Sequence, residues 1–330
     1  MGKKLEEQNL LWRSMRLGDV RALALFEQEC ALVDGDTLVL DEAAWAQRLS
    51  DGEYAAVNSL LALYDGMIAA AGWISFQEEA DEVQGFLDGR VHPAWRGHGI
   101  GAELLHRLER RAITQLDHIA NGRRRVLRIL YYDRREDAVA LYEKAGFSFQ
   151  FAEVEMRRSV VGDLPAHQVP EGIHFFPHSS VTAPLFFQAY THAFSTRPGK
   201  LRQEDVWVHH FADPADPEFV PSLSLVVKWN GDLAGYAVVH RYPREDGIEG
   251  EEYWIAQMGV KPEYRRMGLA TAMLAELAQR VAALGAAELI LSVNVDNPEA
   301  RAVYEASGFR EVKTMTLFRK ELDRSSWKDR

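Results

Sequence analysis

The sequence is poor in cysteine, in long apolar segments and in net positive charge, and each shortage excludes a class of protein. Its 330 residues include one cysteine, Cys30, so no disulfide can form within the chain, and a reducing compartment fits. No apolar run approaches the ~20 residues that a membrane-spanning helix needs, and the first residues lack the apolar centre of a signal peptide. We therefore expect a soluble, cytoplasmic protein with no membrane partner.

The charge balance is acidic, with 38 Lys and Arg against 49 Asp and Glu and a formal net charge of −11. The acidic excess is spread over both halves, so it argues against a nucleic-acid partner and is compatible with a cationic acceptor. Hydrophobic residues make up 47% of the chain, enough for about two ordinary domains. Cys30 lies in a helical pattern, which predicts a buried and unreactive thiol.

What the sequence does contain is a strand–turn–helix pattern that occurs twice. In the C-terminal copy, the strand-like run 253–260 leads into KPEYRRMGLA (residues 261–270) and a long amphipathic helix. In the N-terminal copy, the run 83–91 leads into VHPAWRGHGIG (residues 91–101) and a second such helix. The first amides of a helix lack intrahelical partners and lie at the positive end of its dipole. A helix that begins after a glycine turn therefore suits a phosphate group.

A second shared block follows each copy at a matching place. Residues 138–147 read AVALYEKAGF, and residues 300–309 read ARAVYEASGF. Two ordered blocks, each present twice, indicate that a whole domain of ~165 residues has been duplicated, and this period is too long for a solenoid repeat.

These blocks resemble two motifs of the GNAT superfamily of acetyltransferases. The pattern V-x-P-x-x-R-x-x-G-x-G/A is similar to the motif that holds the pyrophosphate of acyl-CoA, and A-x-x-x-Y-x-x-x-G-F is similar to a later helix-to-strand motif. The resemblance covers about two thirds of each half. It implies acetyl-CoA as the cofactor and two tandem α/β domains, each with a mixed sheet covered by helices on its faces.

The apolar patterns independently predict one element order, β-α-α-β-β-β-α-β-α-β, in both halves. Hairpin turns are predicted at Asp65-Gly66 and at Asn230-Gly231-Asp232. The Pro- and Gly-bearing stretch 162–172 predicts a linker. We therefore predict an N-terminal domain over residues 1–160, a linker over 161–172 and a C-terminal domain over 173–330, each domain containing its own last strand.

The resemblance implies that the pantetheine arm pairs with the strand before each glycine turn, where two parallel strands splay apart, and that turn amides hold the pyrophosphate. The predicted cofactor-binding residues of the C-terminal half are Met258, Gly259, Val260, Arg265, Arg266, Met267, Gly268, Leu269, Ala270, Thr271 and Asn297. Those of the N-terminal half are Gly89, Val91, Arg96, Gly97, His98, Gly99, Ile100, Gly101 and Ala102. The alternative is a half that keeps the fold without the ligand.

Tyr304 and Tyr142 stand where many family members place a general acid, which gives a proton to the departing thiolate. The alternative is that each ring only packs its helix onto the sheet. Asn297 matches the usual asparagine of the family, whereas Arg135 takes its place in the first half. The C-terminal half is therefore the preferred catalyst.

The general base is harder to assign. Many family members carry a glutamate six residues before the motif valine, but Trp254 and Gly85 stand there and neither can accept a proton. Glu252, on the same strand face as Trp254, and Asp88 are the predicted substitutes. Both could equally be solvated carboxylates of a strand edge.

The sequence thus predicts an N-acetyltransferase that moves an acetyl group from acetyl-CoA to a primary amine of an unidentified small molecule. The alternative is a protein that binds acyl-CoA as a sensor without turnover, which the missing glutamates keep open. Acidic clusters at 78–82 and 245–252 would attract a cationic amine if they lie at the acceptor end, or are solvated loops. No metal site is predicted, and the chain is a monomeric pseudo-dimer or a homodimer.

Overall fold

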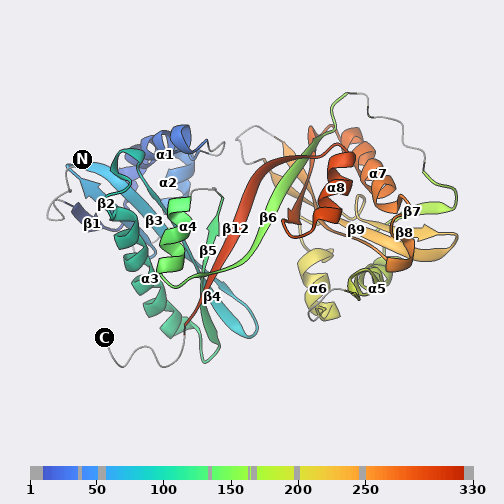
Figure 1. The fold of residues 1–330 in the computed structure, drawn as a ribbon, viewed down its shortest axis with the longest axis horizontal. Helices are drawn as coiled ribbons and strands as arrows, with labels where there is room; N and C mark the ends of the chain where they lie inside the picture. Colours follow the sequence, from blue (N-terminus) through green and yellow to red (C-terminus); the bar gives the residue numbers. More distant parts are fainter. Residues whose placement is uncertain are drawn as a thin grey trace. The chain divides into compact units, whose positions relative to one another are not determined.

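A computed structural model describes residues 10–35, 39–50, 57–132, 136–162, 164, 169–196, 201–244 and 250–322 of the chain (Figure 1). The elements of the first half are β1 (Leu10–Arg13), the 3₁₀ turn η2 (Leu17–Asp19), α1 (Val20–Asp34), α2 (Glu42–Ser50), β2 (Ser59–Tyr64), β3 (Met67–Glu78), β4 (Glu82–Val91), η3 (Pro93–Trp95), α3 (Ile100–Ile119), β5 (Arg124–Tyr131), α4 (Glu136–Lys144) and β6 (Ser148–Ser159).

The second half repeats this order. Its elements are β7 (Ile173–Pro177), α5 (Ala183–Phe194), α6 (Glu204–Phe211), β8 (Leu225–Trp229), β9 (Asp232–Pro243), β10 (Glu251–Val260), η4 (Pro262–Tyr264), α7 (Leu269–Ala283), β11 (Glu288–Asn294), α8 (Pro298–Ala306) and β12 (Arg310–Glu321). The predicted element order and the α/β fold class are confirmed in both halves.

Both predicted hairpins are present. Asp65 and Gly66 have φ of 50° and 81°, and Asn230 and Gly231 have φ of 50° and 92°. Positive φ at both central residues is the geometry of a type I′ turn, whose twist matches that of the two strands that it joins. Asn and Gly adopt positive φ more readily than other residues, which is why the local sequence was sufficient to find these turns.

The last strand of each sequence half lies with the other half. The chain forms two compact units, one comprising Met1–Ala152 and Thr314–Arg330 (the N-terminal unit) and the other comprising Glu153–Lys313 (the C-terminal unit). In the C-terminal unit β6 pairs antiparallel with β11, from Glu288↔Ser159 to Asn294↔Glu153. In the N-terminal unit β12 pairs antiparallel with β5, from Thr316↔Tyr131 to Glu321↔Val126. The units therefore differ from the predicted ranges 1–160 and 173–330, because the two last strands are exchanged.

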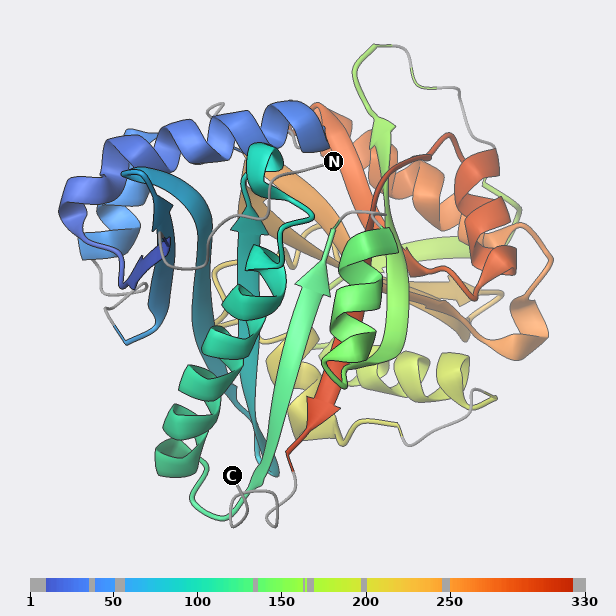
Figure 2. The same cartoon turned by 60° about the vertical axis from the view of Figure 1, so that its left-hand side comes forward.

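In the N-terminal unit the strands follow the order β1-β2-β3-β4-β5-β12. Helix α3 covers β3 and β4 on one face (Figure 2), where Leu104, Leu108 and Leu116 are buried. Helices α1 and α2 cover the other face with Leu23, Phe26 and Trp45 among others. Cys30 is fully buried there, as predicted, and burial raises the pKa of its thiol to about 12.

In the C-terminal unit the order is β6-β11-β10-β9-β8-β7. Figure 1 shows α7 and α8 on one side of this sheet and α5 and α6 on the other. The α7 face buries Leu277 and Val281 against alternate strand residues such as Ile255. The opposite face buries Trp207 and Tyr236. Within the described parts of the chain, no helix is long and apolar enough to cross a bilayer.

Candidate active site

Two parallel strands diverge in the C-terminal unit. Among the described residues, β10 pairs with β11 only from Tyr253↔Leu289 to Ile255↔Leu291, whereas it continues to pair with β9 as far as Val260. The register with β9 shifts between Ile255 and Gln257, so Ala256 forms a β-bulge, which bends the strand. The predicted cofactor ladder of Met258, Gly259 and Val260 lies beyond this divergence.

The bulge is held by buried side chains. The carboxamide oxygen of Gln257 accepts hydrogen bonds from Trp207 Nε1 at 2.7 Å and from the Tyr236 hydroxyl at 2.6 Å. Close packing also fixes β10 beyond the bulge, because a Cβ added at Gly259 would lie 2.7 Å from the Cβ of Ala193. The backbone of β10 past the bulge is therefore held in place by these contacts.

The N-terminal unit shows the same divergence without the bulge. Strand β4 pairs with β5 from Glu82↔Arg124 to Phe86↔Arg128, while its register with β3 runs unbroken from Glu78↔Val83 to Ala70↔Val91. Among the described residues, Gly89 and Val91, the predicted cofactor ladder of this unit, lie past the last pair with β5.

The glycine turns have one backbone shape in both units. Gly97 and Gly99 have φ of 76° and 83°, and the equivalent Arg266 and Gly268 have φ of 61° and 82°. A Cβ at Gly97, Gly99 or Gly268 would meet nothing within 4 Å, so these positions face open space. Arg266 adopts a left-handed conformation that costs an L-residue roughly 1–2 kcal/mol, which indicates that the turn imposes it.

Each glycine turn opens a helix. The first backbone hydrogen bonds of the two helices run from Glu103 to Gly99 (3.2 Å) and from Ala272 to Gly268 (3.0 Å). The amides before these bonds belong to the following residues of the prediction: Ile100, Gly101 and Ala102 in α3, and Leu269, Ala270 and Thr271 in α7. An open turn, a row of amides without intrahelical partners and the positive end of a helix dipole fit a diphosphate.

Two predicted cofactor arginines instead brace their turns. Arg265 donates from Nε to the Val260 carbonyl (3.1 Å) and from Nη2 to the Ala193 carbonyl (2.6 Å). Arg96 donates from Nε to the Val91 carbonyl at 2.9 Å and forms a two-armed ion pair with Asp34, each arm 2.6 Å. Both guanidinium groups therefore bind the end of the preceding strand.

The N-terminal unit has a cavity of about 400 Å³ at its glycine turn. Its lining includes most of the predicted N-terminal residues: Asp88, Gly89, Val91, Arg96, Gly97, Gly99, Gly101, Ala102 and Tyr142. His98 is exposed beside the turn, and its Nδ1 lies 2.9 Å from the Arg96 carbonyl. Tyr142 packs edge-on against Tyr131, with the ring centroids 5.6 Å apart. The structure thus brings the two blocks of the first half together around one cavity.

The second block of the C-terminal unit is also in place. The side-chain oxygen of Asn297 accepts a hydrogen bond from the Ala300 amide at 3.2 Å and so caps α8, which carries Tyr304. Tyr304 packs on the unit's core beside Phe309, with ring centroids 6.1 Å apart. Arg135, the first-half counterpart of Asn297, lies outside the described residues.

A second cavity, of about 720 Å³, lies in the C-terminal unit. Trp254 and Ala256 of β10, Ser292 of β11 and Glu153 of β6 line it from the sheet. His240 and Tyr242 of β9 also line it, and α6 with the loop that follows contributes His209, His210, Phe211, Asp213, Ala215, Asp216 and Glu218. Sequence reasoning missed this group because it combines a loop, a helix end and an exchanged strand, and no motif connects them.

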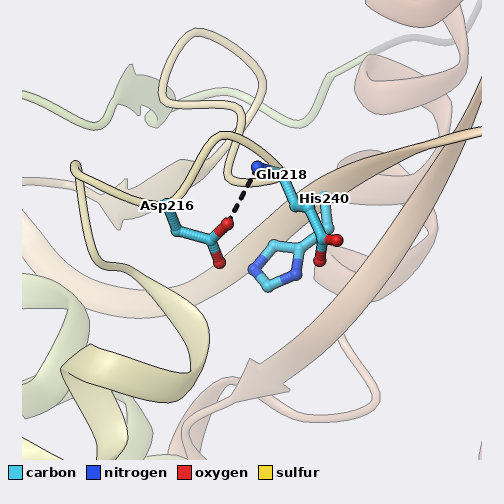
Figure 3. Close-up of side chains that lie close together, drawn as sticks. All are labelled: Asp216, Glu218 and His240. Atoms are coloured by element: carbon cyan, nitrogen blue, oxygen red, sulfur yellow. Dashed lines mark hydrogen bonds between the residues drawn. The ribbon is translucent and has the colours of Figure 1, made fainter. Parts of the chain in front are cut away.

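Asp216, Glu218 and His240 come together at the wall of this cavity (Figure 3). Their ligating atoms lie within 4.8 Å of one another, so the trio is a possible metal-ligating group that the sequence did not indicate. The Asp216 carboxylate accepts the Glu218 amide at 2.9 Å, and His240 Nε2 donates to the Phe211 carbonyl at 2.9 Å. Burial, and then the charges of Glu218 and Asp216, raise the pKa of Tyr242 to about 12.

Glu252, a predicted base, is committed to an ion pair. It is buried, and Arg157 Nη1 donates to its carboxylate at 2.8 Å. The same guanidinium binds Glu155 at 2.7 Å and Glu288 at 3.1 Å. Burial lowers the pKa of Arg157, but these hydrogen bonds outweigh that effect and raise the pKa above its ordinary value. The bond to Glu252 contributes the most among them. Glu252 is also not among the residues that line either cavity, so we do not retain it as a base.

The first acidic cluster is likewise matched by cations. Arg123 pairs with Glu78, Arg124 pairs with Asp81 at 2.9 Å, and Arg319 binds Glu82 at 2.9 Å. Residues 245–249 of the second cluster lie outside the described residues. The predicted attraction of an amine by the first cluster is therefore opposed by its own arginines.

Comparison with known proteins places this geometry in a family. The model of the "Acetyltransferase (GNAT) family" matches residues 185–309, and that of the "Acetyltransferase (GNAT) domain" matches residues 56–149. The mycothiol acetyltransferase of Streptomyces coelicolor is 31% identical over 238 residues, covering 70% of each chain. That of Streptomyces avermitilis is 29% identical over 310 residues, covering 92% of each. The chain belongs to the GNAT acetyltransferase family.

Solved structures agree on the tandem GNAT fold. A GCN5-related N-acetyltransferase from Sphaerobacter thermophilus superposes with a TM-score of 0.67 at 23% identity, covering 95% of this chain and 96% of the other. A tandem GNAT protein from the clavulanic acid biosynthesis pathway gives a TM-score of 0.60 at 15% identity, with 96% and 99% covered. The protein is thus an acyltransferase that moves an acetyl group from acetyl-CoA to an amine acceptor. The glycine turns and helix starts described above fit the diphosphate of that cofactor.

Proposed function

We propose that acetyl transfer takes place in the C-terminal unit, on a small-molecule amine that enters the 720 Å³ cavity. One observation carries this proposal: the bulge residue Ala256, where β10 leaves β11, itself lines that cavity. Acetyl-CoA supplies an activated acetyl thioester, and the family's cofactor lies between such diverging strands. The amine and the acetyl group would therefore meet at Ala256.

The charge of the cavity supports an amine. Glu153, Asp213, Asp216 and Glu218 are among the described residues that line it, and none of those lining residues is Lys or Arg. A cavity lined by one sign of charge concentrates ligands of the opposite sign. Because two relatives are mycothiol acetyltransferases, the deacetylated form of mycothiol, which is an amine, is the first acceptor to test.

Tyr304 is the proposed proton donor. A tyrosine hydroxyl can give a proton to the departing sulfur as a general acid. The cap at Asn297 fixes the start of the helix that carries it. Tyr142 has the same place in the N-terminal unit, where it lines the cofactor-type cavity.

For the N-terminal unit we propose acetyl-CoA binding without turnover. A Cβ at Gly85 would lie 3.2 Å from Leu127 Cδ2 and 3.3 Å from Phe76 Cε1, so a glutamate at the family's base position would have to displace both. The 400 Å³ cavity shows that space for a ligand remains. A sensing or structural role for this unit is the second candidate function, and this packing favours it.

Release of free thiol from acetyl-CoA tests the proposal. Deacetylated mycothiol, glucosamine, spermidine and lysine are offered in turn to the purified full-length chain. Acetylation of at least one of them is expected. Binding of acetyl-CoA by calorimetry with no thiol release from any of the four would favour the sensor in both units.

A further inference from the structure

Glu153 belongs to the N-terminal half by sequence and to the C-terminal unit by structure. It stands opposite Asn294 in the antiparallel register of β6 with β11, and it lines the 720 Å³ cavity together with Trp254 and Ser292. Successive side chains of a strand alternate between faces, so residues 153, 155 and 157 of β6 share one face of the sheet. The ion pair of Arg157 with Glu252 shows that this is also the face of Glu252 and Trp254.

Three carboxylates on this face differ in their ion pairing. Glu252 binds Arg157 at 2.8 Å, and Glu155 binds Arg157 at 2.7 Å and Lys313 at 3.2 Å. For Glu153, by contrast, the described part of the chain offers no side-chain hydrogen bond and no ion pair. Burial alone raises the pKa of its carboxyl group above the ordinary value. A carboxylate that has lost water without gaining a cation holds a proton more tightly, which is the property that a base near neutral pH needs.

We propose that Glu153 is the general base for acetyl transfer in the C-terminal unit; this assignment rests on the proposed function above. An acceptor that arrives as an ammonium ion gives one proton to the Glu153 carboxylate. The amine nitrogen then bonds to the acetyl carbon while the C–S bond breaks, and its second proton leaves. The sulfur keeps the bonding electron pair and takes a proton from Tyr304, which regains one from the nitrogen through solvent. Glu153 passes its proton to solvent, so each turnover releases one proton.

The exchange of strands explains how Glu153 can take the role that Trp254 cannot perform. Strand β10 cannot supply a base at the family's position, because Trp254 has no proton-accepting group. Strand β6 lies next to β11 and enters the same cavity from the far side of the divergence. The catalytic group of one unit therefore comes from the sequence repeat of the other.

The test compares Glu153→Gln with Glu288→Gln in the full-length chain. Glu288 lies on β11, pairs with Arg157 and is not among the residues that line the cavity, so it controls for loss of a charge from the same sheet. With the best acceptor of the four amines, Glu153→Gln should lower kcat by about 10²-fold or more, and the acidic limb of its kcat/KM profile should disappear. Acetyl-CoA affinity by calorimetry should stay unchanged, and Glu288→Gln should stay within about twofold of the wild type.

Stability gives a second readout, which tests the raised pKa that the assignment requires. Because the folded pKa of Glu153 is raised, its stabilising contribution is complete at low pH and is lost as the pH rises through that pKa. Glu153→Gln should therefore be more stable than the wild type at pH 8, with the difference vanishing below the unfolded pKa of about 4.3. A Gln variant that keeps kcat and the pH profile, or that is less stable at pH 8, overturns the assignment. If the wild type acetylates none of the amines, the proposed function itself fails, and this assignment fails with it.

Discussion

At the scale of single residues, equivalent side chains of the two repeats have different surroundings. Tyr304 and Tyr142 occupy the same place in the second block, but Tyr304 follows a capping asparagine in the unit with the bulged strand. Tyr142 stands in the unit whose family base position is closed by packing around Gly85. The same residue type at equivalent positions of the two repeats therefore does not establish the same chemical role.

Removing one hydroxyl tests this difference. Tyr304→Phe should lower kcat at least about tenfold, since the departing sulfur loses its proton donor, while the Kd for acetyl-CoA stays the same. The matched variant Tyr142→Phe should have a smaller effect on kcat. Steady-state thiol release and calorimetry provide both numbers, and a larger loss in Tyr142→Phe would assign catalysis to the N-terminal unit.

Glu252 should affect folding and not turnover. Glu252→Gln removes one of the carboxylates that surround Arg157, while Glu155 and Glu288 remain. Hydrogen bonds to charged groups contribute about 1.5–3 kcal/mol, so the free energy of unfolding should fall by roughly that amount. Urea unfolding measures the loss, and kcat of the folded variant should stay near the wild-type value. A variant with normal stability and no turnover would restore Glu252 as the base.

Some site residues could be predicted and others could not, for physical reasons. The cap at Asn297 and the positive φ at Gly99 and Gly268 follow from local chain geometry, which a short motif records. The turning of Arg265 toward the Ala193 carbonyl depends on a helix far away in sequence. Glu153 carries no local signal, because its burial and the absence of a partner for it among the described residues exist only after folding.

At the scale of elements, the sequence determines what forms but not which copy pairs. Period-two and helical patterns predicted the α-helices and β-strands in order, because each pattern reports a local choice of backbone. Strands β5 and β11 each pair with a last strand, and the two last strands, β6 and β12, come from equivalent places in the repeat. Nothing local distinguishes pairing with the own half from pairing with the other half, so the exchange of β6 and β12 was not predicted.

The exchange makes a prediction about divided chains. Residues 1–160 and 173–330, produced separately, should each lack the strand that their unit takes from the other, and neither should give a cooperative unfolding transition alone. Mixing them during refolding should restore both the transition and thiol release, because each fragment carries the other's missing strand. Thermal unfolding followed by circular dichroism is the measurement. Two fragments that each fold cooperatively alone would contradict the pairing of β12 with β5 and of β6 with β11.

At the scale of the whole molecule, duplication has produced two units with one fold and unequal sites. Both have a glycine turn at the start of a helix, where a diphosphate fits. The C-terminal unit adds a bulge and a carboxylate-lined cavity at the point where its strands diverge. The N-terminal unit keeps its cavity at the glycine turn itself. This difference is the reason we propose acetyl transfer in the C-terminal unit and binding of acetyl-CoA in the N-terminal unit.

The most direct test is the turnover of Gly268→Glu measured against Gly268→Ala. Both variants place an L-residue at a φ of 82° and so carry the same backbone strain, roughly 1–2 kcal/mol, and a Cβ at Gly268 meets nothing within 4 Å. Only the glutamate puts a negative charge where the diphosphate should lie. We expect thiol release with the best amine to fall by at least about 100-fold in Gly268→Glu relative to Gly268→Ala. Equal turnover of the two variants would show that acetyl transfer does not use the start of α7.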